Sequence, residues 1–270
     1  MYYTEQTIRS FDGTSLYVRE AGQKDAPLLL LIHGGSTDAD FYVNTMETMS
    51  RSFHVVAYDR RGHVRSWLTA SAKGPKEAAK EDKAALKDIC GVHAEDAAFL
   101  IDRFSNEIDR AMGAYVITHS LAGPIGFRLV TDHPEKVRKM LCVEPAWEGR
   151  ETLKYGLRAL LPPILFADAR GPVPDPQVLE NIGPDKEMMT AFDWRLIAAF
   201  RRPTEALRDA PLLFAVGEQS KGRIIYESTV RLAAELDKPL FYHPGVHNTG
   251  FNLPKEFAYL CTGALLDQTN

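Results

Sequence analysis

The chain of 270 residues carries a net charge of −4, with 45% hydrophobic and 25% charged residues. This composition is that of an ordinary globular protein, long enough for one large domain or two small ones. A mildly acidic balance without a long basic tract excludes a general attraction to nucleic acid or to anionic membrane surfaces.

The N-terminal segment MYYTEQTIRSFDG has acidic and polar residues where a signal peptide needs an apolar core. The longest apolar run, residues 27–32, is too short to span a bilayer. Three widely spaced cysteines, Cys90, Cys142 and Cys261, form no CxxC or Cys/His metal pattern. We therefore expect a cytoplasmic protein with buried, reduced thiols and no metal. The oligomeric state is left open, a homodimer included.

Two early segments, residues 4–11 and 15–22, are separated by Asp-Gly-Thr and predict an antiparallel hairpin at a sheet edge. Further along, short apolar runs alternate with segments of helical periodicity. These runs are apolar for most of their length, which is typical of strands covered on both faces. They occupy residues 27–35, 53–59, 114–120, 137–145, 211–218 and 238–245.

Between the runs, apolar residues recur at the i, i+3, i+4 spacing of a helix with one buried face. This spacing predicts helices over residues 93–110, 121–133, 225–237 and 254–266. The alternation of strands and helices predicts an α/β fold, with a mainly parallel eight-stranded sheet covered by helices on both faces.

Two regions interrupt this alternation. Residues 69–88 mix both charge signs densely, as in a solvated helix or insert, and we assign them no function. Residues 146–208 contain several prolines and helical fragments without a clear strand, which predicts a helical insertion. The core domain would then comprise residues 1–145 and 209–270.

Ser120 lies where a predicted strand turns into a helix, in the segment Val-Ile-Thr-His-Ser-Leu-Ala-Gly. A sharp strand-to-helix turn strains the serine and requires small residues two positions before and after it, here Thr118 and Ala122. The N–H groups at the start of the helix point toward the serine oxygen. The pattern predicts a nucleophile, with an ordinary tight turn as the alternative.

A His-Gly-Gly segment ends the first apolar run. Glycines at a strand end let backbone N–H groups approach an oxyanion without obstruction by a Cβ atom. We predict Gly35 N–H and Leu121 N–H as the oxyanion donors, with Gly34 as the alternative contributor. The alternative interpretation is a glycine turn without a catalytic role.

The loop Pro-Gly-Val-His-Asn-Thr-Gly places His247 between the last predicted strand and the last predicted helix. In this topology the catalytic base follows the nucleophile and the acid in the sequence. Among eight histidines, His243 is the close rival, but it lies in the strand rather than in the loop. We therefore predict His247 as the base, with a surface or capping histidine as the alternative.

The segments HGG, YDRRGHVRS and THSLAG, followed by a late histidine, resemble the α/β-hydrolase fold superfamily. The resemblance extends from Thr7 to Leu266, although Val64 stands where many members have glycine. It implies a serine hydrolase in which the insertion at residues 146–208 is a cap over the active site. Under that cap, aromatic residues either line a substrate pocket or pack the cap against the core, namely Trp147, Tyr155, Phe192, Trp194 and Phe200.

The resemblance leaves the acid of the triad open. Many members carry an aspartate three residues after the glycine of a GExD segment, but here the segment is VGEQS and the position is Ser220. A neutral hydroxyl cannot stabilise an imidazolium. MLCVEPAW is similar to the pattern of zearalenone-type lactonases, which take their acid from the preceding strand. We therefore predict Glu144 as the acid, with Glu218 as the alternative.

Together these residues predict a hydrolase that cleaves a small-molecule ester or lactone through an acyl-enzyme, without metal or organic cofactor. Serine at position 120 disfavours halide release, which in this fold uses an aspartate nucleophile. Two other classes stay open. One is a receptor for a small ligand, and the other is a non-hydrolytic enzyme of the same fold, such as a lyase or a cofactor-free oxygenase.

Overall fold

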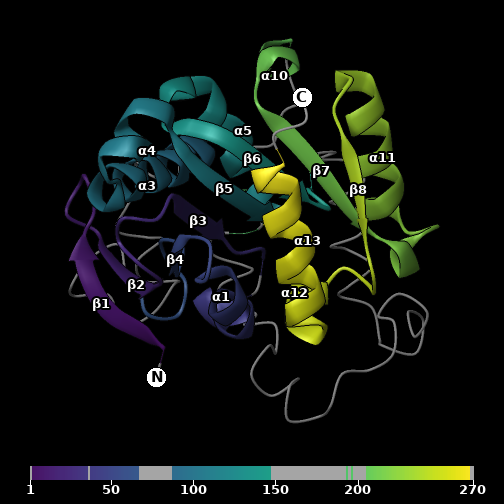
Figure 1. Cartoon of the computed structure of the whole chain (residues 1–270). Helices are drawn as coiled ribbons and strands as arrows, with labels where there is room; N and C mark the ends of the chain where they lie inside the picture. Colours follow the sequence, from purple (N-terminus) through teal and green to yellow (C-terminus); the bar gives the residue numbers. More distant parts are fainter. Residues whose placement is uncertain are drawn as a thin grey trace.

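A computed structural model describes residues 2–35, 37–66, 87–146, 193, 196 and 205–267. The described residues form an eight-stranded sheet in the order β1-β2-β4-β3-β5-β6-β7-β8 (Figure 1). Its strands are β1 (Tyr3–Arg9), β2 (Ser15–Ala21), β3 (Leu28–Ile32), β4 (His54–Tyr58), β5 (Ala114–His119), β6 (Val137–Val143), β7 (Leu212–Gly217) and β8 (Leu240–His243).

Strand pairing confirms the predicted mainly parallel sheet. The β1–β2 hairpin is antiparallel and lies at one edge, as predicted, and β2 also pairs antiparallel with β4. From β4 onward every neighbouring pair is parallel. The carboxyl ends of β3, β5, β6, β7 and β8 therefore meet at one edge of the sheet, where loops of this fold class carry ligands.

Helices cover both faces of the sheet (Figure 1). Residues of α3, α5 and α11 pack on one face, and residues of α1 and α13 pack on the other. The described helices are α1 (Val43–Met49), α3 (Ile89–Phe104), α4 (Glu107–Met112), α5 (Gly123–Asp132), α10 (Ala206–Asp209), α11 (Ile224–Leu236), α12 (Thr249–Asn252) and α13 (Pro254–Leu266).

The uninterrupted apolar run in β3 shows why its strands are covered on both sides. Leu28, Leu30 and Ile32 join the core beneath α3 and α5, whereas Leu29 and Leu31 join the core beneath α1 and α13. All five side chains are fully buried. Each contributes about 1.5–3 kcal/mol by leaving water, so a polar residue at any of the five positions would be costly.

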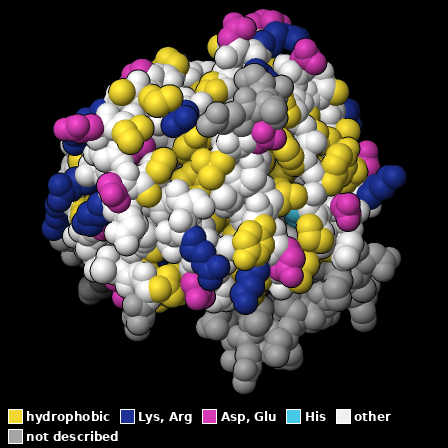
Figure 2. All heavy atoms as spheres, in the orientation of Figure 1, with side chains coloured by type: hydrophobic (Ala, Val, Ile, Leu, Met, Phe, Trp, Pro, Cys, Tyr) yellow, Lys and Arg dark blue, Asp and Glu magenta, His cyan; other side chains and the backbone are white. Residues whose placement is uncertain are grey.

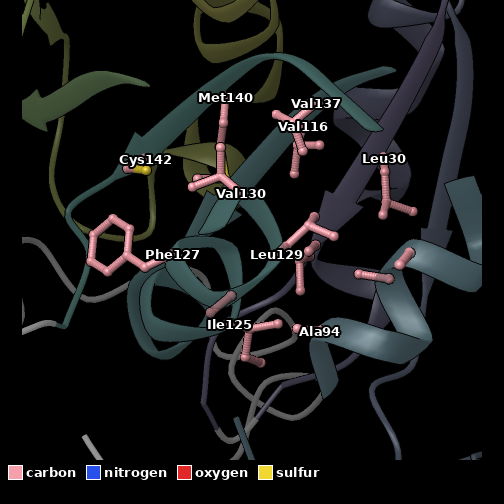
Figure 3. Packing of buried hydrophobic residues seen from close by; sticks show 14 of the residues in the cluster. Leu30, Ala94, Val116, Ile125, Phe127, Leu129, Val130, Val137, Met140 and Cys142 are labelled. Carbon is pink, nitrogen blue, oxygen red and sulfur yellow. The ribbon is translucent and has the colours of Figure 1, made fainter. Parts of the chain in front are cut away.

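Figure 3 shows the first of these cores, where α5 packs on the central strands. Leu129 and Val130 of α5 lie next to the strands, from which Val116 and Met140 extend toward the helix, whereas Ile125 lies beside Ala94 of α3. This packing fixes the start of α5, and therefore the turn that precedes it.

The predicted helix over residues 93–110 differs from the observed structure. It begins earlier, because Asp88 caps α3 by accepting a hydrogen bond from Gly91 N–H, and it breaks after Phe104. Asn106 then starts α4, where its side chain accepts hydrogen bonds from two backbone N–H groups and forms a capping box with Asp109. A polar capping box therefore separates two helices, α3 and α4, where the apolar spacing predicted a single one.

Several predicted regions lie largely outside the described residues. They include most of residues 69–88 and of the expected cap at 146–208, of which Ala146, Asp193, Leu196 and residues 205–208 are described. The cap therefore stays a prediction. So do the pocket positions predicted from the sequence, Trp147, Tyr155, Phe192, Trp194 and Phe200.

Positive and negative side chains are interspersed on the face seen in Figure 2. None of the described helices has the length and apolarity needed to cross a membrane. Among all residues that the structure describes, no group of three or more His, Cys, Asp or Glu side chains is placed so that it could hold a metal ion. Cys90, Cys142 and Cys261 are buried, as predicted.

Candidate active site

The three predicted catalytic residues follow strands that end at the same edge of the sheet. Ser120 comes directly after β5 and Glu144 directly after β6. His247 lies in the loop that follows β8. Because these strands are parallel, residues far apart in the sequence are brought to one edge.

Ser120 adopts a left-handed backbone conformation with φ of 53°. This conformation is strained for a residue with a Cβ atom, and it is the strain that a sharp strand-to-helix turn requires. The turn is held in place because the Ser120 carbonyl accepts a hydrogen bond from Ala146 N–H at 2.9 Å. The structure therefore gives Ser120 the bent backbone predicted for a nucleophile.

Two glycines allow α5 to begin so close to the sheet. A Cβ atom on Gly123 would lie 2.5 Å from Cβ of Pro145, and one on Gly126 would lie 2.6 Å from Cγ2 of Thr118. Both distances are shorter than any ordinary carbon–carbon contact. The tight turn at Ser120 thus depends on glycines in the helix that follows it.

Glu144 and His247 form a direct hydrogen bond. His247 Nδ1 lies 2.6 Å from Glu144 Oε2, while the other carboxylate oxygen accepts a hydrogen bond from Gly217 N–H at 3.0 Å. Glu144 is fully buried, and a quarter of the His247 side chain is exposed. The carboxylate is thereby fixed from both sides, and it orients the imidazole.

Burial raises the pKa of Glu144, but the hydrogen bond and charge of His247 and the Gly217 N–H outweigh it, lowering this pKa to about 2. Glu144 is therefore ionised at neutral pH and accepts the proton of His247 Nδ1. In the neutral imidazole, Nε2 then keeps its lone pair and can take up a proton. This is the state that a general base needs.

His119 links the serine turn to the His247 loop. Its Nε2 lies 2.8 Å from the backbone carbonyl of His247, and the two rings are 4.5 Å apart. The other side of the His119 ring stacks on Phe41. Burial and the neighbouring His247 lower the pKa of His119 to about 3, so it is neutral. Since a carbonyl only accepts, Nε2 carries the proton.

Because His119 directly precedes Ser120 and contacts His247, the Ser120 turn and the His247 loop lie next to each other. Among the described residues, no hydrogen bond joins the Ser120 hydroxyl to His247 directly. In free enzymes such bonds are often long and tighten when substrate binds.

The predicted oxyanion residues pack on the serine turn. A Cβ atom on Gly34 would lie 3.0 Å from Cβ of Ser120, and one on Gly35 would lie 2.2 Å from Cδ1 of Leu121. Leu121 lies in the single 3-10 turn Ser120–Ala122 that leads into α5, where the first backbone N–H groups have no partner within the turn. The structure therefore brings Gly34, Gly35 and Leu121 together around Ser120.

The carbonyl of Gly34 is held by two donors. His33 Nδ1 lies 2.9 Å from it, and Arg60 Nη2 donates to it at 2.8 Å. The backbone N–H of Arg60 donates to His33 Nε2 at 2.9 Å, so the proton of His33 is on Nδ1. Burial and the charge of Arg60 keep the pKa of His33 well below its usual range.

The alternative acid, Glu218, and the rival base, His243, lie nearby but have different surroundings. Glu218 is exposed, and the hydrogen bond to His247 comes from Glu144 instead. Ser220 is fully buried, and its hydroxyl has no hydrogen-bond partner within the described part of the chain. His243 is buried against Phe257, and burial lowers its pKa.

Comparison with known proteins agrees with the fold. The chain belongs to the α/β hydrolase fold family, whose model matches residues 27–171. It is similar to YraK of Bacillus subtilis, an uncharacterized hydrolase that is 26% identical over 266 residues, covering 91% of this chain and 90% of that protein.

Solved structures share the fold at lower identity. Naproxen esterase, a carboxylesterase from Bacillus subtilis, superposes with a TM-score of 0.62 at 17% identity, over 95% of this chain and 89% of that one. A carboxylesterase structure from the archaeon Nitrososphaera gargenis superposes with a TM-score of 0.69 at 17% identity, over 96% of this chain and 97% of that one. At such identities the likeness concerns the fold.

Proposed function

We propose that this protein is a serine hydrolase that cleaves a carboxylic ester or lactone through an acyl-enzyme intermediate. The observation that carries the proposal is the 2.6 Å hydrogen bond between His247 and Glu144, beside a serine in a strained turn. A buried carboxylate fixing an imidazole near a strained serine is the arrangement that activates a hydroxyl nucleophile.

In the first step, His247 Nε2 takes the proton of the Ser120 hydroxyl as its oxygen attacks the substrate carbonyl. The carbonyl oxygen becomes an anion, which the N–H groups of Gly35 and Leu121 stabilise by about 3 kcal/mol per donor. Glu144 stabilises the imidazolium that forms. His247 then gives its proton to the leaving alcohol, and the acyl group remains on Ser120.

In the second step, His247 takes a proton from water as the water oxygen attacks the acyl-enzyme carbonyl. The bond to the Ser120 oxygen then breaks, His247 returns the proton to that oxygen, and the acid is released. With a lactone, the alcohol and the acid are two ends of one product. An ester or lactone is favoured over an amide because an alkoxide leaves more readily than an amide nitrogen. The esterases among the structural neighbours agree with this substrate class.

A panel of esters and lactones, tested on wild type and on Ser120→Ala, examines the chemistry and narrows the substrate together. We expect wild type to give a burst of p-nitrophenol from p-nitrophenyl acetate and to be labelled by a fluorophosphonate, with the adduct located on Ser120 by mass spectrometry. Ser120→Ala loses both. A folded wild type that is not labelled contradicts the proposal and favours a receptor.

A further inference from the structure

Arg60 lies beside the predicted oxyanion loop and is paired with a residue of the segment between β6 and β7. Its Nη2 donates to Asp193 Oδ1 at 2.8 Å, and both side chains are fully buried. His63 Nε2 also lies 3.3 Å from the same carboxylate oxygen. Burial raises the pKa of Asp193, but Arg60 and His63 hold it well below its usual range.

Arg60 holds the loop at two points. Besides Gly34 O, its guanidinium binds the carbonyl of His33, with Nε donating at 3.1 Å. Because a trans peptide is planar, the carbonyl of Gly34 and the N–H of Gly35 point in opposite directions. Fixing this carbonyl therefore fixes the direction of the predicted oxyanion donor, Gly35 N–H.

Asp193 lies close to the same peptide. A Cβ atom on Gly35 would come 3.2 Å from Asp193 Oδ2. Arg60 thus contacts both the loop carbonyls and the carboxylate. A guanidinium buried at this point without its carboxylate would be unpaired and would leave its position toward water or another acceptor.

We propose that Asp193 is a positioning residue for the oxyanion site: its carboxylate holds Arg60 against the carbonyls of His33 and Gly34, which aims Gly35 N–H at the reacting oxygen. This inference rests on the proposed function. It adds to Ser120, His247 and Glu144 a further requirement for turnover, namely the negative charge of Asp193.

The test compares Asp193→Asn with wild type on p-nitrophenyl acetate, with turnover counted per fluorophosphonate-titrated site. Asparagine keeps the shape and removes the charge. We expect kcat to fall by about tenfold to a hundredfold with KM within about twofold, as for partial loss of an oxyanion donor. Affinity for a trifluoromethyl ketone, which forms a tetrahedral adduct on serine, should fall in parallel with kcat/KM.

Two further variants keep the test decisive if Asp193→Asn folds poorly. Arg60→Lys keeps the charge beside Asp193 but cannot bridge both carbonyls, so it should show the same loss of kcat. Arg61→Lys is the matched control, because Arg61 is equally buried and binds Asp96 instead of the loop. It should lose stability in thermal melts and keep wild-type turnover per titrated site.

The outcomes separate this inference from the proposed function. If wild type is not labelled at Ser120, the proposed function fails and this inference fails with it. If wild type is labelled but Asp193→Asn and Arg60→Lys keep its turnover per site, this inference alone is overturned. Equal losses in Arg61→Lys and Arg60→Lys would also overturn it, because they would show a general effect of buried charge.

Discussion

The carboxylate of Glu144 reaches across the end of β7 to His247, which is 103 positions away in the sequence. Glu144 follows β6 and His247 follows β8, and these two strands flank β7. On the way, one carboxylate oxygen binds the N–H of Gly217, the last residue of β7. The charge that orients the imidazole thus comes from a strand two positions away in the sheet.

The first prediction concerns this carboxylate. Glu144→Gln keeps a hydrogen-bonding side chain but removes the charge that stabilises the imidazolium, so kcat should fall by about three to four orders of magnitude. Steady-state kinetics on p-nitrophenyl acetate measures this loss, and circular dichroism checks the fold. Glu218→Gln is the control and should turn over at nearly the wild-type rate. The opposite ranking of the two variants would assign the acid to Glu218.

The second prediction concerns acid pH. The pKa of Glu144 is about 2 in the folded protein, below its ordinary value of 4.5. A group with a lowered folded pKa stabilises the fold fully above its unfolded pKa, and this contribution is lost as the pH falls through the folded pKa. For Glu144 the contribution is on the order of 3 kcal/mol.

The free energy of unfolding should therefore differ most between wild type and Glu144→Gln above about pH 5, and the difference should narrow toward about pH 3. Urea denaturation of both proteins at a series of pH values measures it. A difference that stays constant across this range would mean that the carboxylate is not held in its ionised form by the fold.

The third prediction concerns the glycine that ends β7. A Cβ atom on Gly217 would lie 2.6 Å from the backbone carbonyl of Gly245, in the loop that carries His247. Gly217→Ala should therefore push this loop away, lowering stability by about 1–3 kcal/mol and kcat by about tenfold or more. Gly263→Ala in α13 is the matched control. Its Cβ atom would meet no atom of another described part of the chain within 4 Å, so this variant should stabilise the protein by about 0.5–1 kcal/mol.

Thermal melts and kinetics on both alanine variants give the comparison. If a folded Gly217→Ala protein kept the wild-type kcat, the contact between Gly217 and Gly245 would not be needed to position His247, and the prediction would be wrong.

The fourth prediction compares two fully buried serines. Among the residues that the structure describes, the Ser220 hydroxyl has no hydrogen-bond partner, whereas the Ser66 hydroxyl donates to Asp59 O at 2.7 Å and accepts from Tyr17 N–H at 2.8 Å. Ser66→Ala leaves the buried carbonyl of Asp59 and the partly buried N–H of Tyr17 without this partner and should cost about 1–3 kcal/mol, whereas Ser220→Ala should change stability by less than about 1 kcal/mol. Chemical denaturation measures both. Equal losses would show that Ser220 is hydrogen-bonded in solution.

The sequence predicted the parallel sheet because its strands are apolar on both faces, as the five buried side chains of β3 illustrate. It failed at the end of α3 because Ile108 continues the apolar spacing, yet Ile108 is half exposed in the structure. The signal that could have located this break is the Asn106–Asp109 capping box. A local polar pattern outweighed the periodicity there.

Within the site, the small residues around Ser120 predicted its sharp turn, and the order of the strands predicted that Glu144 and His247 would lie at the same edge of the sheet. The contacts of His33 and Asp193 with Arg60 were not predicted. Arg60 and Asp193 are 133 positions apart, and nothing in either segment indicates which carboxylate would face the guanidinium. Such a pair is decided by three-dimensional packing, whereas the strained serine turn is decided by neighbouring small residues.

The two halves of the site differ in how firmly the sheet holds them. β5, which leads into Ser120, is buried along its whole length and paired on both sides, whereas β8 is a four-residue strand at the edge of the sheet with partly exposed side chains. Short edge segments open at a lower free-energy cost than central ones. On warming, β8 and the loop that follows it should therefore open first and move His247 away from Ser120, while the other strands of the sheet stay paired. Enzymatic inactivation would then begin below the melting temperature and reverse on cooling without global refolding.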